Sequence, residues 1–331
     1  MSMQVEQVKP QRPALRLVST RDMDREEWLS VRKQGIGASD AATAVGLNPY
    51  QSPLELWMIK TGRDQHLPKP DPDDMSSPMY WGNVLEPIVA ENYSRKTGNK
   101  VRRVNAVLQH ADHPWMLANL DYSVVANPEV QILECKTAGE YGARRWRDGV
   151  PDYVQCQVQH QLAVTGKEAA DVCVLLCGQA LEVFRISRDE GAISRLIELE
   201  REFWDYVESD TPPPSDGSKS AHRALQGLYP RDAGTVLDLS SDASLCGDFD
   251  ELLDIRERVS RLEFRESTLK QRIQQRMGDA SKAVFPGGEV SWKRSNDTTV
   301  LDTTRLLKDQ PELLDHYGKL RSGARRFLIH A

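Results

Sequence analysis

The chain has 331 residues and a mass of 37.4 kDa, with 39% hydrophobic and 28% charged residues. This balance is typical of a globular protein large enough to bury a full core, and it excludes a chain that is disordered throughout. The net charge of -6 excludes binding of nucleic acid by an overall positive field, so any polyanion site must be a local basic groove.

The sequence also indicates where in the cell the protein is expected. No stretch approaches the roughly 18 unbroken apolar residues of a membrane helix, and the N-terminus lacks the layout of a signal peptide. The five cysteines form no CxxC pair and are odd in number, so we expect reduced thiols rather than a disulfide framework. We therefore expect a cytoplasmic protein that makes no membrane contact.

The N-terminal part predicts an arm followed by two helices. Residues 1–20 contain two prolines and no hydrophobic periodicity, which predicts a flexible arm. Asp24, with Glu27 three residues later, predicts a capping box and a helix that ends at Gly35. Ser39 is then expected to cap a second, small-residue helix. The free N–H groups of such a helix start can receive a phosphate, although a tight structural turn explains the sequence equally well.

The middle of the chain alternates helical and strand patterns. Helices are expected over residues 54–60, 81–90, 153–164 and 193–208, and strands over 104–109, 116–125, 131–136, 172–176 and 181–186. This order predicts a mixed α/β domain.

A proline-rich segment marks the expected domain boundary. We expect an arm over residues 1–20, a main domain over 21–210, a linker over 211–220 and an accessory region over 221–331. In that last region, apolar residues at heptad spacing from Leu252 to Ile273 predict a long helix that ends at Gly278, and a hairpin follows. The heptad seam could pair two chains or pack on the chain's own main domain.

Three acids and a lysine stand out as carriers of chemistry. Glu134 and Lys136 lie two apart on one strand and share a face, whereas Cys135 points to the other. Asp121 precedes Glu134 by thirteen residues, which allows the two carboxylates to meet across neighbouring strands. Glu86 lies inside an otherwise apolar helix.

Clustered carboxylates repel one another, and a divalent cation relieves that repulsion. Oxygen ligands favour Mg²⁺, which Mn²⁺ can replace, and Mg²⁺ accepts one or two carboxylates together with a substrate phosphate. Lys136 beside such an ion could orient a water molecule, and the set suits hydrolysis of a phosphodiester. Taken alone, the Glu-Cys-Lys strand could equally be an exposed edge with a surface ion pair.

The order of these residues resembles a known family. An Asp followed by Glu-x-Lys is similar to the PD-(D/E)xK nuclease superfamily, and the flanking segments resemble its YqaJ-like viral recombinase branch, to which phage lambda exonuclease belongs. The resemblance spans residues 24–208, and its blocks lie at 28–32, 37–39, 81–86, 120–121, 134–136 and 153–162. It implies an α/β fold with a PD-(D/E)xK nuclease core, a mixed central sheet flanked by helices, to which this chain adds a mainly helical C-terminal extension.

The resemblance also implies a role for each matching residue. Asp121 and Glu134 match metal ligands, Lys136 matches the catalytic lysine and Glu86 matches the helix acid near a second metal. Gln157 matches a glutamine that supports the site, and the backbone carbonyl of Cys135 is expected to join the metal ligands. Arg32 and Ser39 match residues that receive a terminal 5′-phosphate. A leucine, Leu120, stands before Asp121 in place of the proline of the superfamily's name.

A further basic segment is a candidate DNA contact. Arg144, Arg145, Trp146 and Arg147 interleave an aromatic ring with cations just before the glutamine-rich helix, as in a channel that lines phosphates and stacks a base. An equally good interpretation has Trp146 covering the core, with solvated arginines around it.

Together these features predict an Mg²⁺-dependent 5′-to-3′ exonuclease that digests linear double-stranded DNA and leaves 3′ single-stranded tails for recombination by strand annealing. The resemblance implies a ring-shaped homo-trimer, a single-strand annealing protein as partner and a phage or prophage origin in a bacterial host. One alternative is another PD-(D/E)xK deoxyribonuclease, either an endonuclease or a single-strand-specific enzyme. The other is a non-catalytic DNA-binding assembly protein.

Overall fold

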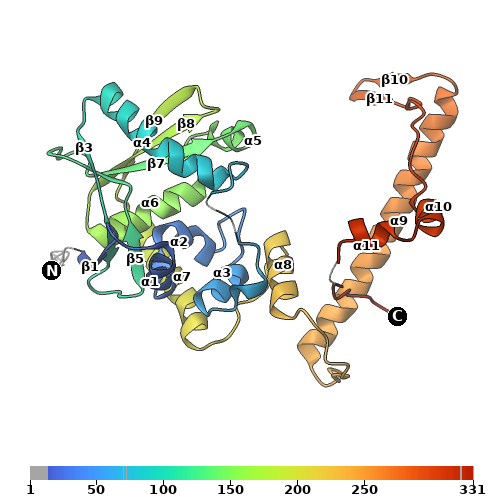
Figure 1. Cartoon of the computed structure of the whole chain (residues 1–331), viewed down its shortest axis with the longest axis horizontal. Coiled ribbons are helices and arrows are strands. Elements are labelled where there is room, and N and C mark those ends of the chain that lie inside the picture. The colour runs from blue at the N-terminus through green and yellow to red at the C-terminus, as the bar shows by residue number, and fades with distance from the viewer. Residues whose placement is uncertain (1–13, 70, 72, 321–322, 331) are drawn as a thin grey trace, which may run out of the picture. The chain divides into compact units, whose positions relative to one another are not determined.

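The computed structural model describes residues 14–69, 71, 73–320 and 323–330 and divides into two compact units. The first unit runs to Pro230 and includes the residues from Phe327 onward, and the second runs from Arg231 to Arg326. Figure 1 shows the helices and strands of each unit. The first unit carries every candidate site residue.

Two sheets form the first unit within the described residues. The four-stranded sheet has the order β1-β4-β5-β2, and the five-stranded sheet has the order β3-β6-β7-β8-β9. Strand β7 is parallel to β8, whereas the other pairs of the larger sheet are antiparallel. The expected mixed sheet is therefore confirmed. The strands are β1 (Leu15–Ser19), β2 (Ile36–Gly37), β3 (Val101–Arg103), β4 (Ala106–Gln109), β5 (Met116–Asn119), β6 (Tyr122–Val124), β7 (Ile132–Ala138), β8 (Ala169–Leu176) and β9 (Ala180–Ser187).

Strand β1 corrects the expectation of a flexible arm over residues 1–20. Four of its five residues pair antiparallel with β4, and the register shifts between Arg16 and Val18. Of these side chains only Val18 is even partly buried, so the strand has no buried face. The strand is set by backbone pairing with a segment about ninety residues away. Residues 1–13 of the predicted arm lie outside the described residues.

The predicted strand over 116–125 is interrupted where the chain passes from one sheet to the other. Strand β5 ends at Asn119 in the four-stranded sheet, and β6 begins at Tyr122 in the five-stranded sheet. Between them, the Asp121 carbonyl accepts a hydrogen bond from the Val104 amide, at 3.2 Å. The apolar pattern runs on through this point, so the sequence did not reveal the change of sheet. Asp121 consequently lies at the junction of the two sheets.

Helix starts follow capping chemistry. Helix α1 (Arg25–Lys33) has the predicted capping box of Asp24 and Glu27. Helix α2 (Ala38–Ala44) begins after Gly37, so the prediction that Ser39 caps it is wrong. The Gly37 N–H donates a hydrogen bond to Asp40 Oδ2, at 3.3 Å. Ser39 is the second residue of the helix.

Helices cover both faces of β7. The other helices of the unit are α3 (Pro53–Lys60), α4 (Pro78–Thr97), α5 (Glu140–Ala143), α6 (Asp152–Thr165), α7 (Glu190–Glu208) and α8 (Lys219–Leu228), with single turns of 3-10 helix over Asp64–His66 and Arg144–Trp146. Leu133 and Cys135 of β7 pack with Val89 and Tyr93 of α4. Ile132 packs into the cluster that includes α6, so alternate β7 residues face opposite helices.

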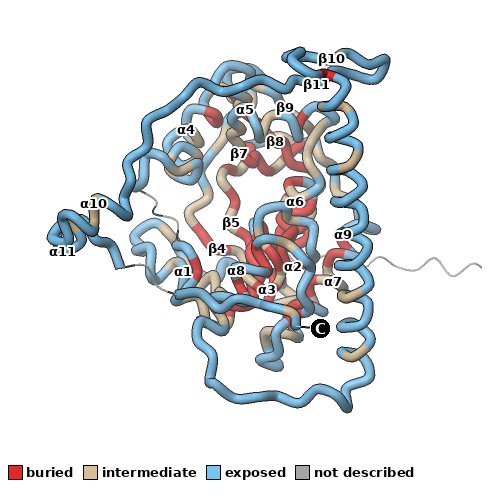
Figure 2. The backbone as a smooth tube through the Cα atoms, turned by 90° about the vertical axis from the view of Figure 1, so that its right-hand side faces the viewer, coloured by how far each residue is buried: buried red, intermediate tan, exposed pale blue. Residues whose placement is uncertain are grey.

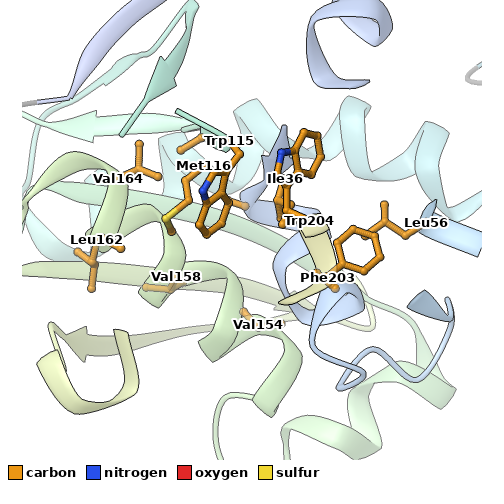
Figure 3. Close-up of a cluster of buried hydrophobic side chains, with 14 of the residues drawn as sticks. Ile36, Leu56, Trp115, Met116, Val154, Val158, Leu162, Val164, Phe203 and Trp204 are labelled. Carbon is orange, nitrogen blue, oxygen red and sulfur yellow. The ribbon is translucent and has the colours of Figure 1, made fainter. Parts of the chain in front are cut away.

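The main core lies between α6, the smaller sheet and α7. Figure 3 shows Met116 and Trp115 beside Val158 and Val164, with Phe203 and Trp204 approaching from α7. A buried imidazole crosses this core: His160 of α6 contacts Glu200 of α7 at 2.7 Å and the Leu117 carbonyl at 2.9 Å. These contacts fix α6, the helix that faces the candidate site, against both neighbours.

The division between the units falls later than the expected linker at 211–220. Residues 211–218 have no regular structure, but α8 then packs against α3. Ser220 of α8 accepts a hydrogen bond from the Ser52 amide at 2.9 Å and donates to Glu55 at 2.5 Å. Buried polar contacts therefore attach residues 219–228 to the first unit.

The second unit contains the expected long helix and hairpin. Helix α9 (Ala243–Met277) ends at Gly278 as predicted, and β10 (Lys282–Phe285) pairs with β11 (Gly288–Ser291). Two short helices follow, α10 (Thr303–Asp309) and α11 (Leu313–Tyr317). In Figure 2, α9 is pale blue and tan over most of its length, whereas buried residues gather along β5, β7, β8 and α6 of the first unit. The mainly helical C-terminal extension is thus confirmed.

Among the residues described, no helix combines the length and the apolar character that a membrane crossing would require.

Candidate active site

The centre of the candidate site is a triangle of side chains on β7 and α6. Lys136 Nζ donates to Glu134 Oε1 at 2.7 Å and to Gln157 Oε1 at 2.9 Å. The Gln157 amide in turn donates to Glu134 Oε1 at 2.6 Å. The two strand residues face α6 because they are two apart on β7, as their spacing predicted. The structure therefore brings together three of the predicted site residues.

Gln161, one turn further along α6, completes the set of donors to Glu134. Its Nε2 donates to Glu134 Oε2 at 2.7 Å, so both oxygens of this 2%-exposed carboxylate are hydrogen-bonded. Gln159 faces elsewhere and donates to the Ser187 carbonyl. Positions four apart share a helix face, so the spacing of Gln157 and Gln161 was the signal that could have assigned a role to Gln161.

Asp121 reaches the site from the junction of the sheets. Its Oδ2 accepts the backbone N–H of Cys135 at 2.8 Å, which places the carboxylate directly beside β7. Burial and the nearby charge of Glu134 together raise the pKa of Asp121 well above its usual range. This is the juxtaposition of carboxylates that the spacing of Asp121 and Glu134 led us to expect.

Glu86 lies on α4 at the edge of the same cluster. Its Oε1 is buried without a hydrogen-bond partner, and the guanidinium of Arg103 is 3.4 Å away. Burial raises the pKa of Glu86, with a further contribution from Glu134. A buried carboxylate oxygen whose only partner is a long ion-pair contact can still bind a further cation.

The lysine keeps its charge in this setting. Burial by itself would lower the pKa of Lys136, but the carboxylates of Glu134 and Asp121 outweigh it and the pKa is raised. Burial also raises the pKa of the Cys135 thiol, so this cysteine stays protonated against α4.

The residues present fit a divalent cation of the magnesium type. Within the described part of the chain, no three His, Cys, Asp or Glu side chains converge as a complete metal-binding group. Mg²⁺ does not require one, because it binds through one or two carboxylates, water and substrate phosphate. Asp121 and Glu134, with the backbone carbonyl of Cys135, the residue after Glu134, could hold it. Burial and the negative charge of Glu134 raise the pKa of Asp121, and a bound cation would offset that charge.

A second polar cluster joins α1, α2 and α3. Arg32 Nη2 donates to Ser39 Oγ and to Asp40 Oδ1, each at 2.7 Å, so the two residues predicted to bind a phosphate are in contact. Lys60 Nζ approaches Asp40 Oδ2 to 2.7 Å and also donates to the Arg32 carbonyl. Burial by itself would raise the pKa of Asp40, but Arg32 and Lys60 hold it well below its usual range. Two cations thus share one carboxylate.

Sequence reasoning missed Asp40 and Lys60 in this cluster. Asp40 looked like an ordinary first-turn acid, and Lys60 is the last residue of a short apolar helix, where lysine is common. Nothing in the local sequence indicated that they would meet, because the contact spans twenty residues and two helices.

The predicted DNA contact at residues 144–147 is only partly exposed. Trp146 is 5% exposed and packs into the core beside Phe184, so its ring is not available for stacking on a base. Arg144 lies over the ring of Tyr141 and Arg145 over that of Tyr50. The structural interpretation of Trp146 therefore holds, and the arginines remain on the surface.

Comparisons with known proteins find relatives of this chain. A family model described as a YqaJ-like viral recombinase domain matches residues 27–168, a range that contains all the candidate catalytic and phosphate-binding residues. The uncharacterized protein YqaJ of Bacillus subtilis (strain 168) is 35% identical over 320 residues, covering 95% of this chain and 96% of that protein.

Two solved structures show weaker likeness. An alkaline exonuclease from Laribacter hongkongensis aligns with a TM-score of 0.46 and 21% identity, covering 56% of this chain and 93% of that chain. A phage related exonuclease from Haemophilus somnus aligns with a TM-score of 0.35 and 11% identity, covering 55% of this chain and 99% of that chain.

Proposed function

The chain belongs to the YqaJ-like viral recombinase domain family, and from this premise we propose that it is an Mg²⁺-dependent 5′-to-3′ exonuclease on linear double-stranded DNA. In this proposal it leaves 3′ single-stranded tails that a single-strand annealing protein uses in recombination. A ring-shaped homo-trimer acting in the cytoplasm of a phage-bearing bacterium completes the proposal.

The observation that carries the proposal is the joint placement of Asp121, Glu134 and Lys136. An acid at the sheet junction bonds to the amide between the other two, and the lysine ammonium is held at 2.7 Å from Glu134. Such a set combines oxygen ligands for a cation with a fixed cationic donor. Both lower the barrier to hydrolysis of a phosphodiester, because negative charge builds up on the phosphate oxygens as the bond breaks.

Each side chain then has a physical task. Asp121, Glu134 and the Cys135 carbonyl would hold the cation, which when bound would polarise the phosphate and lower the pKa of a water molecule. Lys136 orients the attacking water and stabilises charge on the phosphate. Gln157 fixes Lys136 and Glu134 in this geometry through a hydrogen bond to each, and Gln161 supports Glu134 from the other side. Glu86 offers a buried oxygen for a second cation.

End recognition is assigned to Arg32 and Ser39. The Arg32 guanidinium already donates a hydrogen bond to the Ser39 hydroxyl. Arg32 and Lys60 both pair with the single carboxylate of Asp40, so the cluster carries one excess positive charge. A terminal 5′-phosphate can accept hydrogen bonds from both groups. Arg144, Arg145 and Arg147 are proposed to contact the DNA backbone, without the stacking role first expected for Trp146.

Digestion of one plasmid in two forms tests the proposal. With Mg²⁺, the linear form should be degraded and the covalently closed form should stay intact, and EDTA should stop the reaction. Asp121→Ala should abolish degradation, whereas Glu182→Ala, at an exposed acid of β9, should behave as wild type. Cut circles would instead support an endonuclease. Binding without cleavage of any form would support a non-catalytic assembly protein.

A further inference from the structure

A groove of about 620 Å³ lies on the first unit beside the candidate active site. Its lining comes from the edge strand β1 of the four-stranded sheet, the edge strand β3 of the five-stranded sheet, and β4, which pairs with β1. Residues of β1 and its following turn form one part of the lining, and residues 102–106 with Leu108 form the other. Only the pairing of β1 with β4 brings the N-terminal segment to this position.

The groove is strongly basic, in contrast to the chain as a whole. Four arginines line it, Arg16, Arg21, Arg102 and Arg103, and Asp22 is the one acid among the described lining residues. Arg16 donates to the Asn105 carbonyl and Arg103 pairs with Glu86. No ion pair between described residues engages Arg21 or Arg102, and both side chains are exposed. The net charge of the protein is -6, so this excess of positive charge is local.

One end of the groove adjoins the catalytic carboxylates. Arg103 is 3.4 Å from Glu86, and it pairs in register with Tyr122, the residue after Asp121. The amide of the next groove residue, Val104, bonds to the Asp121 carbonyl at 3.2 Å. A chain of phosphates that lies in the groove would therefore lead directly to the site where the phosphodiester is cut.

We propose that this groove binds the sugar–phosphate backbone of the DNA strand adjacent to the scissile phosphate. The inference rests on the proposed nuclease function and extends it to a substrate subsite. Guanidinium groups without acidic partners are suited to phosphate oxygens. The described lining contains no aromatic side chain, so the groove contacts the backbone without stacking on bases, and binding is independent of sequence.

The test is DNA binding measured as a function of salt. Wild type and an Arg21→Gln/Arg102→Gln variant are titrated against a short fluorescein-labelled duplex in EDTA, where no cleavage occurs, at several NaCl concentrations. Loss of two phosphate contacts should reduce the slope of log K against log salt by about 1.8 and weaken binding roughly tenfold or more near 0.1 M salt. A Lys167→Gln/Arg195→Gln variant removes the same charge from exposed sites outside the groove and should bind as wild type.

Three results would overturn the inference: an unchanged slope in the groove variant, an equal loss in the control variant, or no binding by the wild type. Because the measurement needs no cleavage, it separates the two proposals. A wild-type protein that degrades linear DNA while the groove variant keeps the full slope would refute the groove alone. Selective loss in the groove variant, together with a wild type that cleaves nothing, would support the groove and refute the nuclease.

Discussion

At the scale of single residues, Glu134 shows how the fold supports charge in its interior. The carboxylate is 2% exposed, yet an ammonium and two amides donate to its oxygens. Burying a carboxylate is costly unless such donors compensate it. Two of the three donors lie on α6, which His160 fixes to β5 and α7, so the geometry of the site depends on the packing of the core.

Lys136 is the most direct residue-scale test of the catalytic assignment. Lys136→Met keeps the length of the side chain and removes the ammonium that we assign to the attacking water. We expect cleavage of linear duplex to fall by about 10² to 10⁴-fold, the usual contribution of a positioned acid–base group. Lys167→Met, at an exposed position, is the matched control. A Lys136→Met protein as fast as wild type would refute the assignment.

His110 gives a residue-scale prediction of pH dependence. Its Nδ1 accepts the backbone N–H groups of Asp112 and His113, at 3.0 and 3.1 Å, which requires an unprotonated ring nitrogen. Burial, with His113 nearby, lowers the pKa of His110 to about 4 from an ordinary value of 6.5. In the unfolded chain the ring binds its proton near pH 6.5, so between pH 6.5 and 4 only the unfolded state is protonated.

The stability contributed by neutral His110 should therefore be complete above pH 6.5, fall as the pH drops and level off below about 4. The total loss should be at most roughly 3 to 4 kcal/mol, from about 1.4 kcal/mol per pKa unit over the shift from 6.5 to about 4. NMR titration of the ring measures the pKa, and denaturant unfolding at both ends of the window measures the stability. His110→Asn, whose side-chain oxygen can accept the same amides, should remove this part of the pH dependence. A ring that titrates near 6.5 would contradict the account.

At the scale of residues, the sequence predicted the members of the candidate active site better than the buried ion-pair partners around Arg32 and Ser39. Asp121, Glu134, Lys136 and Gln157 follow from strand and helix spacing together with family resemblance. Asp40 and Lys60 could not be predicted in the same way, because a buried ion pair between two helices leaves no local pattern. Trp146 was ambiguous because an aromatic ring among arginines suits both a core and a DNA surface, and only its burial decides.

At the scale of elements, local signals predicted helices better than strands. The capping box of α1 and the apolar periodicity of α6 and α9 placed these helices correctly. The strand predictions were wrong where pairing depends on partners far away in the sequence. Strand β1 is largely exposed and paired only through its backbone, and the break at Asp121 lies inside a segment where apolar residues recur on both sides of it. That break matters for function, since it places Asp121 between the sheets.

Helix α8 supplies an element-scale prediction of stability. Ser220 is 5% exposed and accepts the Ser52 amide while it donates to Glu55. Ser220→Ala leaves the buried Ser52 amide without its hydrogen bond and removes a donor from the half-buried Glu55, which should lower the free energy of unfolding by about 1 to 3 kcal/mol. Chemical denaturation measures the change. Ser215→Ala, at an exposed position, should change it by less than about 0.5 kcal/mol. Equal stability of the two variants would show that α8 is not anchored to α3.

At the scale of the whole molecule, the two units are unequal in their cores. Among the described residues, every buried hydrophobic side chain except Met277 lies at or before Ala224. The candidate site residues all lie between Arg32 and Gln157, inside the first unit. The sequence predicted a main domain and a helical extension, but the partner of the α9 heptad seam stays a prediction, either between chains or on the chain's own domain.

A chain that ends at Pro230 should therefore fold cooperatively and degrade linear duplex with the Mg²⁺ dependence of the full protein. The physical reason is that the first unit has its own hydrophobic clusters and is of ordinary domain size. Circular dichroism melting and the linear-plasmid assay check both properties. A shortened chain that aggregates or loses all activity would mean that residues 231–331 complete the fold or the site.

The central claim is end-directed hydrolysis at the Asp121, Glu134 and Lys136 site, with Arg32 and Ser39 holding the terminal phosphate. The most direct test compares initial rates of Mg²⁺-dependent digestion on linear duplexes with 5′-phosphate and with 5′-hydroxyl ends, while the fate of each strand is followed. If hydrolysis is directed to 5′-phosphate ends at this site, the phosphorylated duplex should be digested faster and the 3′-ended strands should be recovered intact. Equal rates for the two ends, or loss of the 3′-ended strands first, would contradict it.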